Sequence, residues 1–449
     1  MRPIKFLPAG FLVLSSFLSA QVPGILLERG LSASVFTTLA RPVGLAFPPA
    51  GSLFSPKLHI LQAGAFMNGP AGGGLYVADA NGGLTTVVQT VGLDPTGLAF
   101  DPHGSYGKDL FITNLGAGNG DNDGCVMRVT PAYGVTTFVF PFTGLHDTYG
   151  ITFGRSAGFG TDMFVCDDVD GAASLFDVFR ISQKGVVASF ADLGGPTSLI
   201  AGDPASWWGG HLFVANSLGG GWRGTGEVLS LDSAGKVVNT LVTGFNGVTG
   251  LTFGVGNVWG DDMFGGGYLV GKSVWRMDTS GAMRTVLLGV DNRYHPHTIA
   301  FDPVDGADMY VTDLNRDRVL RVTTEAGVSF SGSFKPGSSV DVTLRSPWDD
   351  GGRAYIAAAS FNHRPGVKIG KRIIPVVLDP LFAMSQTMPV FFEGFQGVLT
   401  LSGTGKARIH VPAIPALSGL RIYVTFVTLQ AGAPDGISRI AAARSFVIQ

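Results

Sequence analysis

A six-residue phrase returns along the first 300 residues of this chain and limits the folds open to it. Its clearest copy is Pro95-Thr-Gly-Leu-Ala-Phe100. The third positions of its copies are Gly44, Gly97, Gly150, Ser198, Gly250 and Thr298. They follow one another at spacings of 53, 53, 48, 52 and 48 residues. A nearly constant period of this length, containing only short strand-like runs, predicts a propeller or a solenoid.

Each unit carries a second apolar run, 10 to 14 residues after the first. These runs are Leu58–Gln62, Leu110–Asn114, Met163–Asp167, Leu212–Asn216, Met263–Gly267 and Met309–Asp313. Two further alternating runs follow, such as Val126–Val129 and Val135–Phe138. Four short runs separated by Gly, Asn, Asp and Pro are typical of a four-stranded blade. A helical reading fails because β-branched and aromatic residues dominate, without apolar spacings of three and four.

Six such units predict an all-β, six-bladed β-propeller over residues 31–324. The preceding segment, Ala33–Leu39, is similar to the fourth runs Val135–Val139 and Val186–Phe190. We therefore expect it to pair with the last blade, which would close the ring and hide a sheet edge. The alternative is a linear array of blades.

The repeat stops near Thr324, and residues 325–449 have a different texture. About seven short strand-like runs occur there: Val340–Leu344, Ala354–Ser360, Ile373–Leu378, Val398–Leu401, Ala407–Val411, Leu420–Phe426 and Arg444–Ile448. This number of strands in a segment of this length predicts a C-terminal β-sandwich, similar to immunoglobulin-like domains. Tails of this texture are similar to attachment domains of exported proteins.

Residues 1–20 have the pattern of a secretory signal peptide. Arg2 and Lys5 precede a mostly apolar stretch, and Ser19-Ala20-Gln21 offers small residues for cleavage. No later stretch is long enough to cross a bilayer as an apolar helix. We expect a secreted, cell-surface or periplasmic protein.

The composition agrees with an exported all-β chain. Glycine accounts for 66 of 449 residues, about twice the usual share, and only 14% of the residues are charged. The formal net charge is −2 and no basic block is present, which argues against nucleic-acid binding. Cys125 and Cys166 fall at one rim of neighbouring blades, so the sequence leaves a disulfide and two buried thiols equally open.

The phrase Pro-x-Gly-Leu-Ala-Phe-Asp-Pro, followed by Asp-Leu-Phe-Ile-Thr-Asn, resembles the repeat of NHL-type and gluconolactonase-like six-bladed propellers. The resemblance covers residues 31–324. In its calcium-dependent lactonase branch, acidic and amide residues surround the central channel. Carried onto this chain, that implies Ca²⁺ ligands at the ends of the second strands, namely Asn114, Asp167, Asn216 and Asp313. The competing interpretation is that these side chains cap turns.

Two loops that enter first strands are unusually rich in polar residues. Leu145-His146-Asp147-Thr148-Tyr149 enters the third unit, and Arg293-Tyr294-His295-Pro296-His297 enters the sixth. Units three and six face each other in a six-membered ring, so both loops would reach the channel mouth. Catalytic candidates are His146, Tyr149, Arg293, His295 and His297, because imidazoles exchange protons or bind metals near neutral pH. The alternative is that they are polar loop residues packed on the rim.

Two weaker signals remain. Gly118–Gly124 resembles a calcium loop but lacks the closing glutamate of an EF-hand. Tryptophans in loops could stack on sugar rings or pack against the rim; these are Trp207, Trp208, Trp222 and Trp259. No nucleophile elbow, phosphate loop or dinucleotide fingerprint is present.

The leading functional hypothesis is an exported propeller that binds a ligand or partner at the mouth of its channel. The partner would be a small molecule, a carbohydrate or a cell-surface protein. The alternative is a metal-assisted hydrolase or lyase acting on a lactone, an ester or a polysaccharide. A third class is an adhesion component attached through its C-terminal region.

Overall fold

The computed structural model describes most of the chain between residues 22 and 449. The described ranges are 22–28, 31–64, 72–116, 123–141, 143–155, 158–168, 177–203, 208–216, 226–244, 247–254, 259, 262–267, 272–278, 281–291, 293–303, 308–324, 327–346, 350–369, 372–401, 403–432 and 434–449. The predicted signal peptide and most of the Gly118–Gly124 loop lie outside them.

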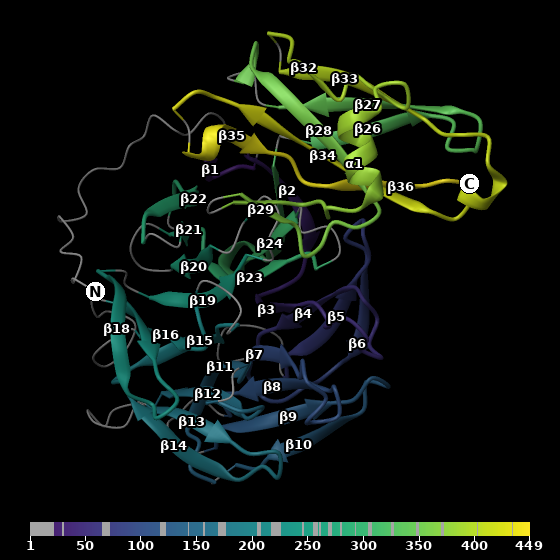
Figure 1. Ribbon diagram of the computed structural model, residues 1–449. Helices are drawn as coiled ribbons and strands as arrows, with labels where there is room; N and C mark the ends of the chain where they lie inside the picture. Colours follow the sequence, from purple (N-terminus) through teal and green to yellow (C-terminus); the bar gives the residue numbers. More distant parts are fainter. Residues whose placement is uncertain are drawn as a thin grey trace.

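Four-stranded antiparallel sheets dominate the first three quarters of the chain, which confirms the all-β class (Figure 1). The recurring phrase forms the first strand of each sheet: β3 (Pro42–Ala46), β7 (Pro95–Phe100), β11 (Asp147–Phe153), β15 (Pro196–Ala201), β19 (Val248–Phe253) and β23 (Pro296–Phe301). Each first strand contacts the next, and β23 contacts β3. The sheets therefore form a closed ring of the propeller type.

The second apolar runs form the second strands: β4 (Leu58–Gln62), β8 (Leu110–Asn114), β12 (Met163–Asp168), β16 (Leu212–Asn216), β20 (Met263–Gly267) and β24 (Asp308–Asp313). Most are buried along their whole length. The reason is that both faces of each sheet pack against neighbouring sheets. One hydrophobic cluster lies between each pair of neighbours around the ring.

Third and fourth strands complete each sheet toward the outside. The third strands are β5 (Gly74–Ala78), β9 (Cys125–Val129), β13 (Asp177–Ile181), β17 (Glu227–Leu231), β21 (Ser273–Met277) and β25 (Arg318–Thr324). The fourth strands of the first five sheets are β6 (Leu84–Val88), β10 (Val135–Val139), β14 (Val187–Asp192), β18 (Val237–Thr243) and β22 (Met283–Gly289).

The N-terminal segment provides the missing fourth strand of the last sheet. β2 (Leu31–Thr38) pairs antiparallel with β25, with Ala33 opposite Val322. This confirms the predicted pairing. The sequence did not predict β1 (Ile25–Leu27), which adds a fifth strand outside β22. Ile25 and Leu27 are buried between the last two sheets, so the N-terminal segment covers the outer edges of both.

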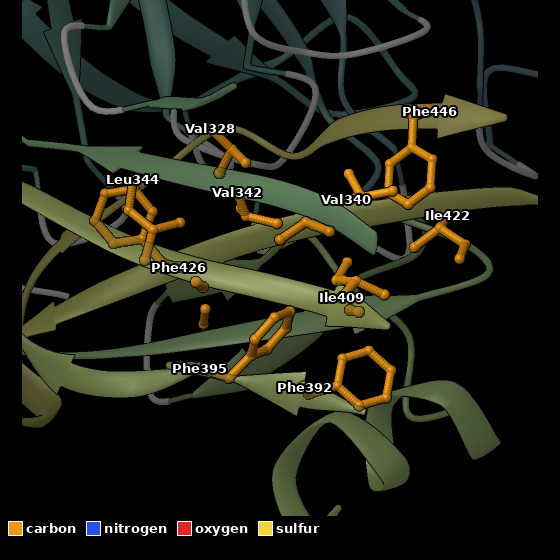
Figure 2. Close-up of a cluster of buried hydrophobic side chains, with 14 of the residues drawn as sticks. Val328, Val340, Val342, Leu344, Phe392, Phe395, Ile409, Ile422, Phe426 and Phe446 are labelled. Carbon is orange, nitrogen blue, oxygen red and sulfur yellow. The ribbon is translucent and has the colours of Figure 1, made fainter. Parts of the chain in front are cut away.

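Beyond residue 327 the chain forms two further antiparallel sheets. One contains β26 (Gly327–Gly332), β27 (Ser339–Arg345), β33 (Thr404–His410) and β31 (Phe392–Glu393). The other contains β32 (Gln396–Val398), β28 (Ala354–Ser360), β34 (Arg421–Leu429), β35 (Ile437–Ile440) and β36 (Arg444–Val447). Figure 2 shows the buried cluster that both sheets share, including Val342 and Phe392 from the first and Phe426 and Phe446 from the second.

One predicted strand of this region takes another form. Residues 373–378 do not join either sheet; β29 (Val367–Ile369) and β30 (Arg372–Ile374) make a separate two-stranded hairpin. Pro375 has no N–H to donate, which explains why β30 ends there. The short helix α1 (Pro380–Thr387) then begins behind Asp379, whose side chain accepts a hydrogen bond from the Phe382 N–H at 2.8 Å. Single turns of 3-10 helix occur at Leu314–Arg316 (η3), Pro415–Leu417 (η5) and Pro434–Gly436 (η6).

No helix in the described part of the chain is long and apolar enough to span a membrane.

Candidate functional site

A central cavity of about 660 Å³ runs along the first strands of the ring. All six first strands contribute to its wall, from Thr96, Tyr149, Thr197, Thr249 and His297 near their starts to Phe47, Phe100, Phe153, Phe253 and Phe301 near their ends. Cavities of roughly 300–1,000 Å³ are typical of small-molecule sites. The cavity is therefore large enough for a ligand of one or two sugar rings.

Hydrogen bonds between neighbouring sheets ring the inner part of this cavity. They are made by the second residue of the phrase, whose side chain reaches a carbonyl oxygen of the next first strand. Thr96 donates to Thr148 O at 2.7 Å, Thr197 to Val248 O at 2.5 Å, and Thr249 to Pro296 O at 2.9 Å. The phrase therefore encodes the contact between sheets as well as the strand itself.

His297 occupies the same position in the last sheet. Its Nδ1 lies 2.8 Å from Val43 O, and since a carbonyl only accepts, Nδ1 carries the proton. Nε2 makes no hydrogen bond to any residue that the structure describes, and it is the ring nitrogen left to accept one from a ligand. Burial lowers the pKa of His297 to about 4, so the ring is neutral at pH 7. A neutral imidazole of this pKa is a good hydroxyl acceptor and a weak base.

We call the end of the cavity at which the first strands start its inner end, and the end at which they finish its outer end. The outer end carries the charged and aromatic groups of the cavity. Arg155 and Asp203 line it from the segments that follow β11 and β15, and both side chains are exposed. Trp208 is half-buried there, with its ring centroid 5.8 Å from that of Phe253 and 5.8 Å from that of Phe213. This packing holds one indole at the rim, where an apolar ring meets polar groups.

A hairpin of the C-terminal region completes the same end. Arg364, Pro365 and Ile373 are among the residues that line the cavity, although they lie far from the ring in sequence. Figure 1 shows β29 between the ring and the C-terminal sheets. The cavity is thus built from both parts of the chain.

The five residues predicted as catalytic separate in the structure. Tyr149 and His297 line the cavity from opposite sheets, whereas His146, Arg293 and His295 are not among its lining residues. Arg293 is exposed, and its N–H donates to Asp291. His295 is buried with its ring centroid 5.9 Å from that of His297, and burial together with His297 and Arg41 lowers its pKa to about 2. The loops that enter the first strands lie where those strands begin. They are therefore at the opposite end of the strands from Arg155 and Trp208.

The four residues predicted as calcium ligands each hold the loop that enters their own sheet. Asn114 accepts the Asp94 N–H at 2.9 Å, and both carboxylate oxygens of Asp167 accept the His146 N–H, at 2.9 and 3.0 Å. Asn216 donates to Leu193 O at 2.8 Å, and Asp313 accepts the His295 N–H at 3.1 Å. These contacts are those of turn caps.

The electrostatics of Asp313 also differ from those of a calcium ligand. Its second oxygen accepts from Arg318 Nε at 2.9 Å and lies 4.0 Å from Arg316 Nη1. Burial raises the pKa of Asp313, while the His295 N–H and Arg318 oppose that rise. Within the described residues, no group of three or more His, Cys, Asp or Glu side chains is arranged to hold a metal ion. Calcium stays a prediction.

The structure also places the two cysteines and two of the four loop tryptophans singled out in the sequence. Cys125 and Cys166 are both buried free thiols, and burial raises the pKa of Cys125 to about 11. Trp259 is buried in the core rather than exposed. Trp207 and Trp222 lie outside the described residues.

Sequence reasoning missed Arg155, Asp203 and the hairpin. A signal for the first two existed. The residue two places after the first strand is proline in three repeats, Pro48, Pro102 and Pro303, whereas the third and fourth carry Arg155 and Asp203. Nothing in the repeat points to Arg364, because its place depends on how the C-terminal region sits against the ring.

No protein-family model and no curated protein matches this chain. Solved structures are similar at low identity. The holo form of the pyranose dehydrogenase PQQ domain from Coprinopsis cinerea is 11% identical, with a TM-score of 0.46 over 67% of this chain and 97% of that one. The SapL1 lectin in complex with alpha methyl fucoside is 13% identical, with a TM-score of 0.41 over 76% of this chain and 99% of that one.

Raptor from Chaetomium thermophilum is 11% identical, with a TM-score of 0.38 over 66% of this chain and 29% of that one. All three TM-scores lie below 0.5, so function has to be argued from the residues of this chain. The resemblance to NHL-type and gluconolactonase-like propellers stays a prediction.

Proposed function

We propose that this protein binds a small polyhydroxylated ligand, of the carbohydrate class, in its central cavity. The observation that carries the proposal is the pairing of an aromatic rim with a neutral hydrogen-bond acceptor inside one cavity of about 660 Å³. Trp208 offers an apolar face to a sugar ring at the outer end. His297 Nε2 accepts a hydrogen bond from a ligand hydroxyl at the inner end, because Nδ1 already donates to Val43.

We favour a binding function over a catalytic one because of the chemistry of His297. A general base works best when its pKa lies near the working pH, and the pKa of His297 is lowered to about 4. Tyr149 lines the same cavity, but it belongs to the third sheet of the ring, opposite the sheet that carries His297. The hydrolase or lyase alternative is tested by assaying turnover of lactone, ester and polysaccharide substrates in the same samples.

Isothermal titration calorimetry tests the proposal. The full chain is titrated with a panel of monosaccharides and disaccharides, followed by Trp208→Ala. A matched control is Phe140→Ala, which removes an aromatic side chain that is 64% exposed at the end of β10 and is not part of the cavity wall. We expect Trp208→Ala to weaken binding about tenfold and Phe140→Ala to leave it unchanged. A panel without any binder, or equal affinities for both variants, contradicts the proposal.

We further propose that binding takes place outside the cytoplasm, on the strength of the signal-like pattern in residues 1–20. Val22 packs in the core between the last two sheets, so cleavage after Ala20 would leave that packing intact. Mass spectrometry of the exported protein checks this, with a mature chain beginning at Gln21 as the expected result. A chain retained in the cytoplasm with Met1 in place would count against it.

A further inference from the structure

The hairpin from the C-terminal region is fixed in place, which matters because it forms one wall of the cavity. Its two stems are joined by the Val377 N–H, which donates to Asn362 O at 3.1 Å. The Phe361 N–H donates to Asp379 at 2.7 Å, and Asp379 also caps α1. His363 lies against Tyr423 of β34, with ring centroids 4.6 Å apart. Arg364 therefore leaves a stem that is anchored to the C-terminal sheet.

The charges on the cavity wall are unequal. Its side chains include two guanidinium groups, Arg155 and Arg364, and one carboxylate, Asp203, while His297 is neutral at pH 7. Among the described residues of the wall, the guanidinium groups thus outnumber the carboxylates two to one. Asp203 interacts electrostatically with Arg155. The second guanidinium group, that of Arg364, is contributed by the hairpin.

A guanidinium group suits one kind of ligand group in particular. It presents N–H donors in a planar fork that matches a carboxylate or a sulfate in two parallel hydrogen bonds. Its five donors also allow it to hold a protein partner and a ligand at once. A neutral sugar would use Trp208 and His297 but would gain little from this group.

We propose that the β29–β30 hairpin recognises an anionic group of the ligand through Arg364, so that the cavity selects acidic over neutral carbohydrates. This inference rests on the proposed function and adds the chemical class of the ligand. The ring supplies the stacking face and the hydroxyl acceptor, and the C-terminal region supplies selectivity.

The test is calorimetry on the full chain with three matched methyl glycosides: a neutral hexoside, the corresponding hexuronate and a sulfated hexoside. The wild-type protein should bind at least one acidic glycoside about tenfold more tightly than the neutral one, and the preference should fall as salt rises. The hexuronate and sulfate arms distinguish the two anionic groups. Arg364→Gln should remove the preference by lowering the affinity for the acidic glycoside far more than the affinity for the neutral one.

Lys368→Gln is the matched control, because Lys368 is exposed on the same hairpin and does not line the cavity. Melting curves establish that both variants are folded. Equal affinity of the wild-type protein for neutral and acidic glycosides overturns the inference and leaves the proposed function standing. An equal loss of the preference for acidic glycosides in Arg364→Gln and Lys368→Gln has the same meaning. Failure of every glycoside to bind overturns the proposed function itself.

Discussion

The imidazole Nδ1 of His297 donates a hydrogen bond to the carbonyl oxygen of Val43, 2.8 Å away, and so joins the last sheet of the ring to the first. Threonines do the same between other sheets. The ring is also closed by β2, which pairs with β25 at its outer edge. Closure therefore has an inner component, the His297 contact, and an outer component, the N-terminal strand.

His297→Phe should cost about 1 kcal/mol of unfolding free energy. The cost is modest because Thr298 Oγ1 also donates to Val43 O, at 2.5 Å. Thr298→Val alone should cost a similar amount. The double variant leaves the Val43 carbonyl without either donor, so its loss should exceed the sum of the two. Urea unfolding measures all three, and strict additivity would show that the two side chains do not share this acceptor.

Stability should fall as the pH drops from 6.5 toward 4. Burial lowers the pKa of His59 and of His297 to about 4, so the unfolded chain binds protons in this window that the folded chain does not. The contribution of these two neutral histidines to the free energy of unfolding is complete above pH 6.5 and is lost as the pH falls from 6.5 to about 4. For each histidine, the difference in pKa between the unfolded and the folded chain corresponds to roughly 3 kcal/mol of unfolding free energy.

The contribution of one histidine can be isolated by comparing unfolding free energies of the wild-type protein and His297→Phe at pH 7 and pH 4.5. We expect the difference between the two proteins to shrink or reverse at the lower pH, because only the wild-type protein keeps this buried imidazole. Parallel pH profiles would contradict the assignment.

Asp313→Asn should lower stability by roughly 3 kcal/mol. Arg318 would then be a buried cation without its carboxylate, and such a loss is costly. The control is Asp341→Asn, which breaks an exposed ion pair with Arg408 and should shift the melting temperature far less. A catalytic role alone would leave the melting curve of Asp313→Asn in place.

The calcium hypothesis makes a separate prediction. If Asn114, Asp167, Asn216 and Asp313 bind Ca²⁺, the purified protein contains about one equivalent by elemental analysis, and chelation lowers its melting temperature. Asp167→Asn should then abolish the effect of the chelator. A melting temperature that ignores both calcium and chelator would leave these residues with the turn-capping role alone.

The outer closure can be tested by a pair of neighbouring substitutions. Ala33 is buried in β2 opposite Val322, whereas the next residue, Ser34, is exposed. Ala33→Asp should therefore cost several kcal/mol and expose the edge of β25, giving aggregates in size-exclusion chromatography. Ser34→Asp should behave like the wild-type protein. Similar behaviour of the two variants would refute the role of β2 in closing the ring.

The repeat predicted strands well because one phrase carries three signals at once. Its apolar residues form a buried strand, its glycine or small third position allows close approach of the next sheet, and its second residue bonds across the junction. Gly150 illustrates the approach, since a Cβ there would lie 2.8 Å from the Ser198 Cα. Such local rules can be read from one sequence.

The site was harder to predict because it depends on relations between distant segments. The sequence placed His297 in a polar loop, but only the structure reveals that it bonds to Val43, 254 residues away. Similarly, Asp313 was recognised as polar at a strand end, while its partner Arg318 and the His295 N–H decide what it does. Arg364 belongs to a region outside the repeat, so no pattern within the repeat could place it at the cavity.

The proposed ligand site lies inside the ring, between Trp208 and His297. The most direct test is a crystal structure of the protein soaked with the tightest-binding glycoside from the panel. We predict difference density in the cavity, with a sugar hydroxyl within hydrogen-bond distance of His297 Nε2 and a ring against Trp208. Density at the opposite rim beside Arg293, or outside the ring altogether, would contradict the account.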